Sequence, residues 1–130
     1  MTRQELEEIM IIDKRINSKI RQKERLENLA CYGSPQGFEQ ERVQSSPKDR
    51  ADMIVKAVDL EREIISEIDK LIGLKAEAIN IFRTLLPKER QLMEYRYLEG
   101  MKWEDVSVAM GYRDPRRAFQ VHDEVLRKLF

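Results

Sequence analysis

The sequence has few of the residues that mark catalytic or metal-binding proteins. Cys31 is the only cysteine among 130 residues, so an internal disulfide is impossible and an intracellular setting is favoured. His122 is the only histidine, and no Cys/His spacing, glycine-rich phosphate loop or paired nucleophile and base is present. We therefore expect a protein that is not an enzyme and that takes no cofactor, no metal and no small-molecule substrate.

Long apolar runs and a net charge are also missing. No stretch approaches the roughly 18 apolar residues of a membrane span, and no signal peptide opens the sequence, so we expect a cytoplasmic protein with no membrane partner. Lysine and arginine number 24, as do aspartate and glutamate. The chain as a whole therefore has no field that would draw it onto nucleic acid.

The sequence does contain many charges and a helical apolar period. Charged residues make up 37% and aromatic residues 7%, which is the composition of a long-helix protein. A capping box at Thr2–Glu5 and a second start at Ser46–Asp49 predict two long helices, with a loop at about 31–46. The first apolar stripe is Leu6, Ile9, Ile12, Ile16, Ile20, Leu26 and Leu29. The second is Ile54, Val58, Ile65, Ile68, Ile72, Ile79, Phe82 and Leu86.

The charges indicate how these two helices would pair. An antiparallel hairpin that closes near residue 40 places residue x opposite roughly 80 − x, so basic residues of 14–21 would face acidic residues of 59–66. Isoleucine on a narrow stripe suits a coiled coil. Two helices alone make a thin core, so we expect a second copy to cover it. Residues 1–86 are thus predicted to form a helical hairpin and homodimerisation region. The sequence alone does not distinguish a hairpin that closes within one chain from one that closes between two.

Three shorter helices are predicted in residues 87–130. The first covers about 88–98 after Pro87, and the second covers about 103–110 before Gly111. The third starts with Asp114 as N-cap and Pro115 as its first residue and runs to the chain end. This spacing is the helix-turn-helix pattern. The predicted fold is all-α, with a long antiparallel, coiled-coil-like hairpin followed by a C-terminal three-helix helix-turn-helix domain.

The third helix has an apolar face and a basic start. Its apolar stripe is Ala118, Val121, His122, Val125, Leu126 and Leu129. Arg116, Arg117 and Gln120 fall off this stripe, with Arg113 just before the helix, and long donors there suit contact with base edges in a major groove. Lys102, Arg96 and Lys88 are weaker candidates for phosphate contacts. The plainer interpretation is a solvated helix start, and residues 87–130 hold nine basic and eight acidic residues, which predicts weak DNA binding.

The stretch LPKERQLMEYRYLEGMKWEDVSVAMGY resembles region four of bacterial sigma factors. The whole chain resembles a family of small phage and prophage proteins of Gram-positive bacteria, which join a helical N-terminal half to such a helix-turn-helix. Further matching stretches are Val58–Glu61, Ile68–Lys75 and Val121–His122. Related phage proteins activate late genes. The resemblance implies a sequence-specific transcriptional regulator in a bacterial host cell, with double-stranded DNA and RNA polymerase as partners.

This sequence departs from the sigma pattern at the second helix and at the turn. Lys102 replaces the usual Ser or Thr cap, so the second helix should start less well capped. The usual turn length would bury Arg117 and Gln120, whereas one extra residue buries Ala118 and Val121. Burying an unpaired arginine costs far more than lengthening a loop, so we predict the longer turn and a recognition helix at 115–129.

A rival interpretation is a protein-interaction module. In that case the hairpin is the functional surface, binding RNA polymerase or inhibiting another phage or host protein, and the helix-turn-helix is only a scaffold. The near-zero charge of residues 87–130 favours it, and the arginine cluster disfavours it. His122 and Trp103 are expected to be packing residues in either case.

Overall fold

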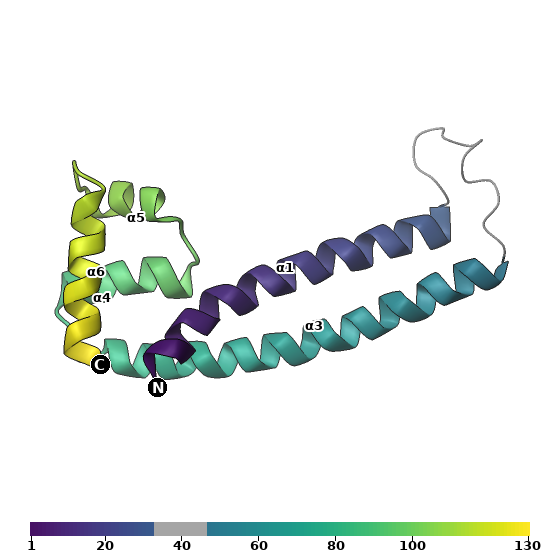
Figure 1. The fold of residues 1–130 in the computed structure, drawn as a ribbon, viewed down its shortest axis with the longest axis horizontal. Helices are drawn as coiled ribbons and strands as arrows, with labels where there is room; N and C mark the ends of the chain where they lie inside the picture. Colours follow the sequence, from purple (N-terminus) through teal and green to yellow (C-terminus); the bar gives the residue numbers. More distant parts are fainter. Residues whose placement is uncertain (33–46) are drawn as a thin grey trace. The chain divides into compact units, whose positions relative to one another are not determined.

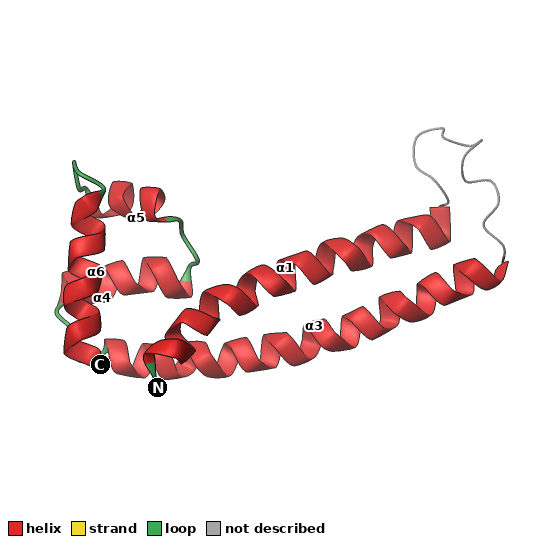
Figure 2. Ribbon diagram, viewed as in Figure 1, coloured by secondary structure: helices red, strands yellow, loops and turns green. Residues whose placement is uncertain are grey.

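A computed structural model describes residues 1–32 and 47–130, and every regular element in these ranges is helical (Figure 2). The all-α prediction is therefore confirmed. The elements are α1 (Arg3–Tyr32), α3 (Pro47–Phe82), α4 (Pro87–Met93), the π-helical segment η1 (Glu94–Leu98), α5 (Trp103–Met110) and α6 (Arg116–Leu129). The loop predicted at about 31–46, with the Ser46 cap and the Cys31 side chain, lies outside what the structure describes. Within the described ranges, no helix combines the length and apolarity that a membrane crossing needs.

The chain divides into two compact units. Unit 1 comprises Met1–Asp13 and Lys70–Phe130, and unit 2 comprises Lys14–Asp69. The first turns of α1 and the end of α3 thus belong with residues 87–130, whereas the sequence suggested a boundary near Pro87.

Unit 2 consists of the later part of α1 and the earlier part of α3, which run side by side in opposite directions (Figure 1). Ion pairs join them: the Arg15 guanidinium lies 3.2 Å from the Glu67 carboxylate, and the Lys19 ammonium lies 3.5 Å from that of Glu63. The Lys19–Glu63 pair links the two charged groups that the sequence predicted to face each other. Partly exposed pairs of this kind contribute modest stability each, and they help to set the orientation of paired helices.

The apolar stripe predicted for α3 is buried only at Phe82, and the prediction is wrong for the rest of the helix. Its members Ile54, Val58, Ile65, Ile68, Ile72 and Ile79, called here the isoleucine row, are all exposed. The buried positions before Phe82 are Ala57, Ile64, Leu71, Leu74 and Ala78, which follow a second seven-residue repeat beside the first. The one charged residue in that second repeat is Glu67, which Arg15 and Lys19 of α1 neutralise. α3 is apolar over so wide an arc that the period alone could not decide which side would be buried.

Unit 1 is built around a core to which every one of its helices contributes. Its fully buried large side chains are Leu6, Ile9, Ile12, Phe82, Leu92, Met93, Val106 and Val125. The first predicted short helix, about 88–98, is α4 continued by the π-helical η1, whose wider turn is closed by the Glu99 N–H donating to the Glu94 carbonyl at 3.0 Å. This wider turn has Tyr97 in the core and Arg96 against Trp103.

The second short helix, α5, matches its prediction in both bounds. Lys102 precedes it without a side-chain cap, as predicted, and Gly111 ends it in the left-handed conformation at φ 76°. A residue with a side chain would be strained at this φ, so glycine is favoured for the turn into α6.

Candidate nucleic-acid interface

Helix α6 begins at Arg116, with Pro115 as its N-cap residue, close to where the sequence placed it. The Asp114 carboxylate accepts the Arg116 backbone N–H at 2.9 Å, which satisfies one of the unpaired amides of the first turn. Pro115 is the residue before the first full helical position. The predicted start, with Asp114 as N-cap and Pro115 as first residue, therefore differs from the structure by a single residue.

The packing of α6 confirms the predicted longer turn. Ala118 and Val121 are buried, together with Val125 and Leu126, and they fix one face of the helix against unit 1. Arg117 and Gln120 are exposed on the other side. The shorter turn would have exchanged these two pairs.

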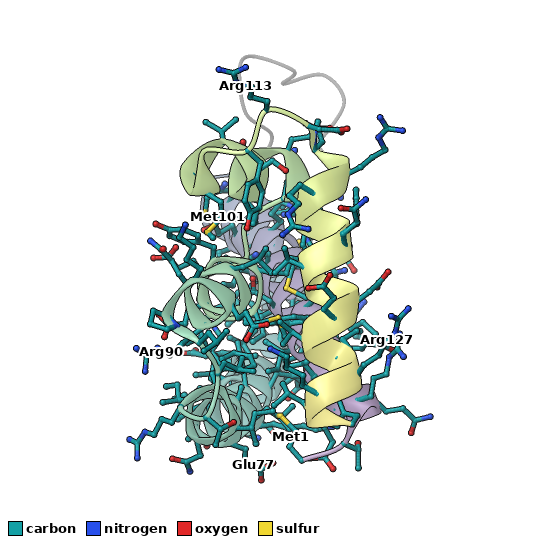
Figure 3. The ribbon with its side chains drawn as sticks, turned by 90° about the vertical axis from the view of Figure 1, so that its left-hand side faces the viewer. Met1, Glu77, Arg90, Met101, Arg113 and Arg127 are labelled. Atoms are coloured by element: carbon teal, nitrogen blue, oxygen red, sulfur yellow. The ribbon has the colours of Figure 1, made fainter. Side chains whose placement is uncertain are left out.

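The exposed face of α6 carries three of the predicted site residues in its first turn and a half. These are Arg116, Arg117 and Gln120, and Arg113 is exposed in the turn just before them. Figure 3 shows Arg113 at the N-terminal end of α6 and Arg127 toward the other end. Asp123 and Glu124 are exposed on the later part of the same face, so the basic character is confined to the helix start.

Arg116 is held in place by Asp114. Its Nε donates to Asp114 Oδ1 at 3.2 Å and its Nη2 donates to Oδ2 at 2.9 Å, in the bidentate geometry that arginine and carboxylates favour. This hydrogen bonding lowers the pKa of Asp114 and raises the pKa of Arg116. The Arg116 side chain is nevertheless 82% exposed, so it is oriented without being covered.

Arg96 and Lys102 lie near the start of α6, but Arg96 is already engaged. Its guanidinium lies 4.6 Å from the centre of the Trp103 ring, and Nη1 donates to the Met101 carbonyl at 2.9 Å. Burial lowers the pKa of Arg96. Lys102, in contrast, is exposed immediately before α5 and remains available to an anion.

A pocket of about 570 Å³ lies between the starts of α5 and α6. Its lining residues are Arg96, Lys102, Trp103, Glu104, Pro115 and Phe119. Phe119 is 45% exposed, and its ring centre lies 5.0 Å from that of Trp103. Phe119 was not predicted as part of the site, because it falls one residue off the apolar stripe of this helix. A large aromatic residue outside the apolar stripe was the only sequence feature that could have indicated its place in this pocket.

Lys88 lies away from this group. It belongs to the first turn of α4, where the neighbouring Glu89 carboxylate pairs with the Lys128 ammonium at 2.6 Å. Lys128 is in the last turn of α6, twelve residues and therefore about 18 Å along the helix from Arg116. The structure thus brings Lys102 and Arg96 to the start of α6 and leaves Lys88 at its other end.

His122 and Trp103 are packing residues, as predicted. The Tyr97 hydroxyl and His122 Nε2 are 2.7 Å apart, and the Trp103 ring meets the imidazole edge-on at 4.7 Å between centres. Burial lowers the pKa of His122 and raises the pKa of Tyr97 to about 12. This hydrogen bond ties α6 to η1 and so helps to fix the direction in which α6 points.

No protein-family model, curated protein or solved structure matches the chain. Among the described residues, no group of three or more His, Cys, Asp or Glu side chains is placed to hold a metal ion.

Proposed function

We propose that the protein is a sequence-specific DNA-binding transcriptional regulator of the phage or prophage type, with α6 lying in the major groove. In this proposal α5, the turn at Gly111 and α6 form a helix-turn-helix, and α1 and α3 form an antiparallel hairpin. Double-stranded DNA is the partner, RNA polymerase is a second one, and the setting is the cytoplasm of a bacterial host.

The observation that carries the proposal is the exposed start of α6. Arg116, Arg117 and Gln120 extend from one side of the helix while Ala118 and Val121 anchor the other side in the core. Arginine and glutamine are the side chains that donate to guanine and adenine edges in the major groove. An ordinary solvated helix start would not need four side chains with long hydrogen-bond donors within the eight residues 113–120.

The charge of residues 87–130 limits how tightly a single copy would bind. Because DNA affinity rests largely on neutralised phosphates, nine basic residues against eight acidic ones supply little of it. Lys102, exposed before α5, supports the site as a phosphate contact, and Arg96 acts mainly by positioning Trp103. Two linked copies on neighbouring half-sites would raise the effective affinity.

The test is fluorescence-anisotropy titration of duplexes from the encoding locus, across salt concentrations. Wild type is compared with Arg116→Ala/Arg117→Ala and with a matched control, Arg21→Ala/Arg25→Ala, which removes the same charge from exposed positions of α1. We expect sequence-preferring binding that is lost in the α6 variant and kept in the control. Equal loss in both variants would show that binding depends on total charge and not on α6.

The second candidate function is a protein-interaction module. The near-zero charge of residues 87–130 favours it, because DNA affinity rests largely on neutralised phosphates. In this alternative the helical hairpin binds RNA polymerase or inhibits another phage or host protein, and the C-terminal helices act as a scaffold. Absence of DNA binding at low salt, with the protein fully helical, would favour it.

A further inference from the structure

Helix α3 exposes one complete side of branched apolar residues. The members of the isoleucine row are between 38% and 61% exposed, and Val55 beside them is 58% exposed. They recur at spacings of three, four and seven residues, which is the pattern of one helix binding along another. The neighbouring repeat of α3, which includes Ile64 and Leu71, is buried, whereas the isoleucine row is not. The exposed fractions of the row show that no described part of the chain covers it.

The row is interrupted and flanked by charges of both signs. Glu61 and Lys75 occupy two of the row's own positions, and Arg62 and Asp69 lie on one edge of it. Arg62 and Asp69 are seven residues apart, so both are at the same edge of the helix. Charges at the edge of a helix–helix seam decide which partner, and which orientation, is accepted.

We infer that the isoleucine row binds the isoleucine row of a second copy of this chain, with the two α3 helices antiparallel and the two-fold axis between residues 66 and 67. In this register Ile65 of one copy contacts Ile68 of the other, and Ile54 contacts Ile79. Each contact occurs twice because a two-fold interface is self-complementary. The inference concerns α3 alone and does not depend on DNA binding by α6.

The edge charges select this register. It places Arg62 of one copy beside Asp69 of the other, and the symmetry repeats the pair. A shift of the register by one heptad in one direction would bring Arg62 against Arg62, and a shift in the other direction would bring Asp69 against Asp69. Of these three registers, only the central one pairs opposite charges. Because like charges in contact destabilise an interface, the central register is favoured.

The two charges within the row also favour the antiparallel orientation. In a parallel pair, Glu61 would face Glu61 and Lys75 would face Lys75. In the antiparallel register, Glu61 of one copy lies one layer from Lys75 of the other. Lys75 donates one hydrogen bond to the Leu98 carbonyl at 3.1 Å, and its ammonium has two further donors. A partner of unrelated sequence would not require this two-fold self-complementarity.

The first test is the molar mass of the full chain by light scattering over a range of concentrations. Wild type should have twice the 15.5 kDa of one chain, and Ile65→Glu/Ile68→Glu should have half the wild-type mass while remaining helical by circular dichroism. The matched control Ile11→Glu/Val108→Glu changes two exposed apolar residues outside the row and should remain dimeric. A monomeric wild type, or dissociation of both variants alike, would overturn the inference.

A charge exchange tests the register without touching an apolar residue. Asp69→Arg and Arg62→Asp should each raise the dimer Kd by about tenfold, because two attractive pairs become repulsive, and the double exchange should restore it. Failure of the double exchange to restore the dimer would contradict the proposed register.

The orientation is measured by spin labels in a Cys31→Ser background. Label pairs at Ser66→Cys should be close together, and pairs at Asp52→Cys should be about 44 Å apart along the helix axis. Equal distances at both sites would show a parallel pair and refute the antiparallel arrangement.

Discussion

Two neighbouring isoleucines of α3 provide a direct test of which side of this helix packs against α1. Ile64 is 8% exposed and Ile65 is 54% exposed, although the predicted apolar stripe included Ile65 and not Ile64. Replacing Ile64 with alanine removes three buried carbons at about 0.8 kcal/mol each and leaves a cavity, so we expect a loss of about 2–4 kcal/mol. Ile65→Ala removes half-exposed carbons and should cost about 1 kcal/mol or less.

The assay is urea unfolding, followed through the loss of the helical circular dichroism signal. Alanine is a better helix former than isoleucine in both variants, so the difference between them, about 2 kcal/mol, is unaffected by propensity. Repeating the measurement at higher protein concentration should leave the Ile64→Ala effect unchanged and increase that of Ile65→Ala. A larger loss for Ile65→Ala at low concentration would show that the isoleucine row packs against α1 and would refute this account.

Three further predictions concern unit 1. Because burial lowers the pKa of His122, the folded state disfavours its protonation. The free energy of unfolding should therefore be highest above the unfolded pKa of about 6.5 and fall as the pH drops below it. The urea midpoint should show this pH dependence in wild type and lose it in His122→Gln. Gly111→Ala should cost about 1 kcal/mol in thermal unfolding, because φ 76° is strained for alanine, and no loss would contradict the cap assignment. Arg116→Ala should cost about 1–3 kcal/mol on a preferred duplex and relax specificity at one base, whereas Lys102→Ala should weaken all duplexes alike; the reverse pattern in competition titrations would reject these roles.

The helix ends were predictable because they depend on local chemistry. Pro47 and Pro87 each begin a helix and Gly111 ends one, as their fixed or unusual φ values require. The buried face of α6 was also predictable, since the alternative placed Arg117 in the core. In each case, the alternative structure would have had a large local free-energy cost, either from backbone strain or from a buried unpaired charge.

The seam of α3 was not predictable from its period. Two repeats run side by side along this helix, and the choice between them depended on a residue of another helix, because Arg15 neutralises Glu67 in the buried repeat. The contacts of the candidate site were not predictable for the same reason, because they depend on residues of other elements. The stacking of Arg96 on Trp103 joins residues of separate elements, and the π-helical turn that positions Arg96 has no local sequence signal.

The measurement that tests the central claim most directly is the affinity ratio between a preferred duplex and a scrambled duplex of equal length. If α6 contacts base edges, the ratio should be well above one for wild type and close to one for Arg116→Ala/Arg117→Ala, with the helical content unchanged. A ratio that stays the same in the variant would contradict the proposal that these arginines provide sequence specificity.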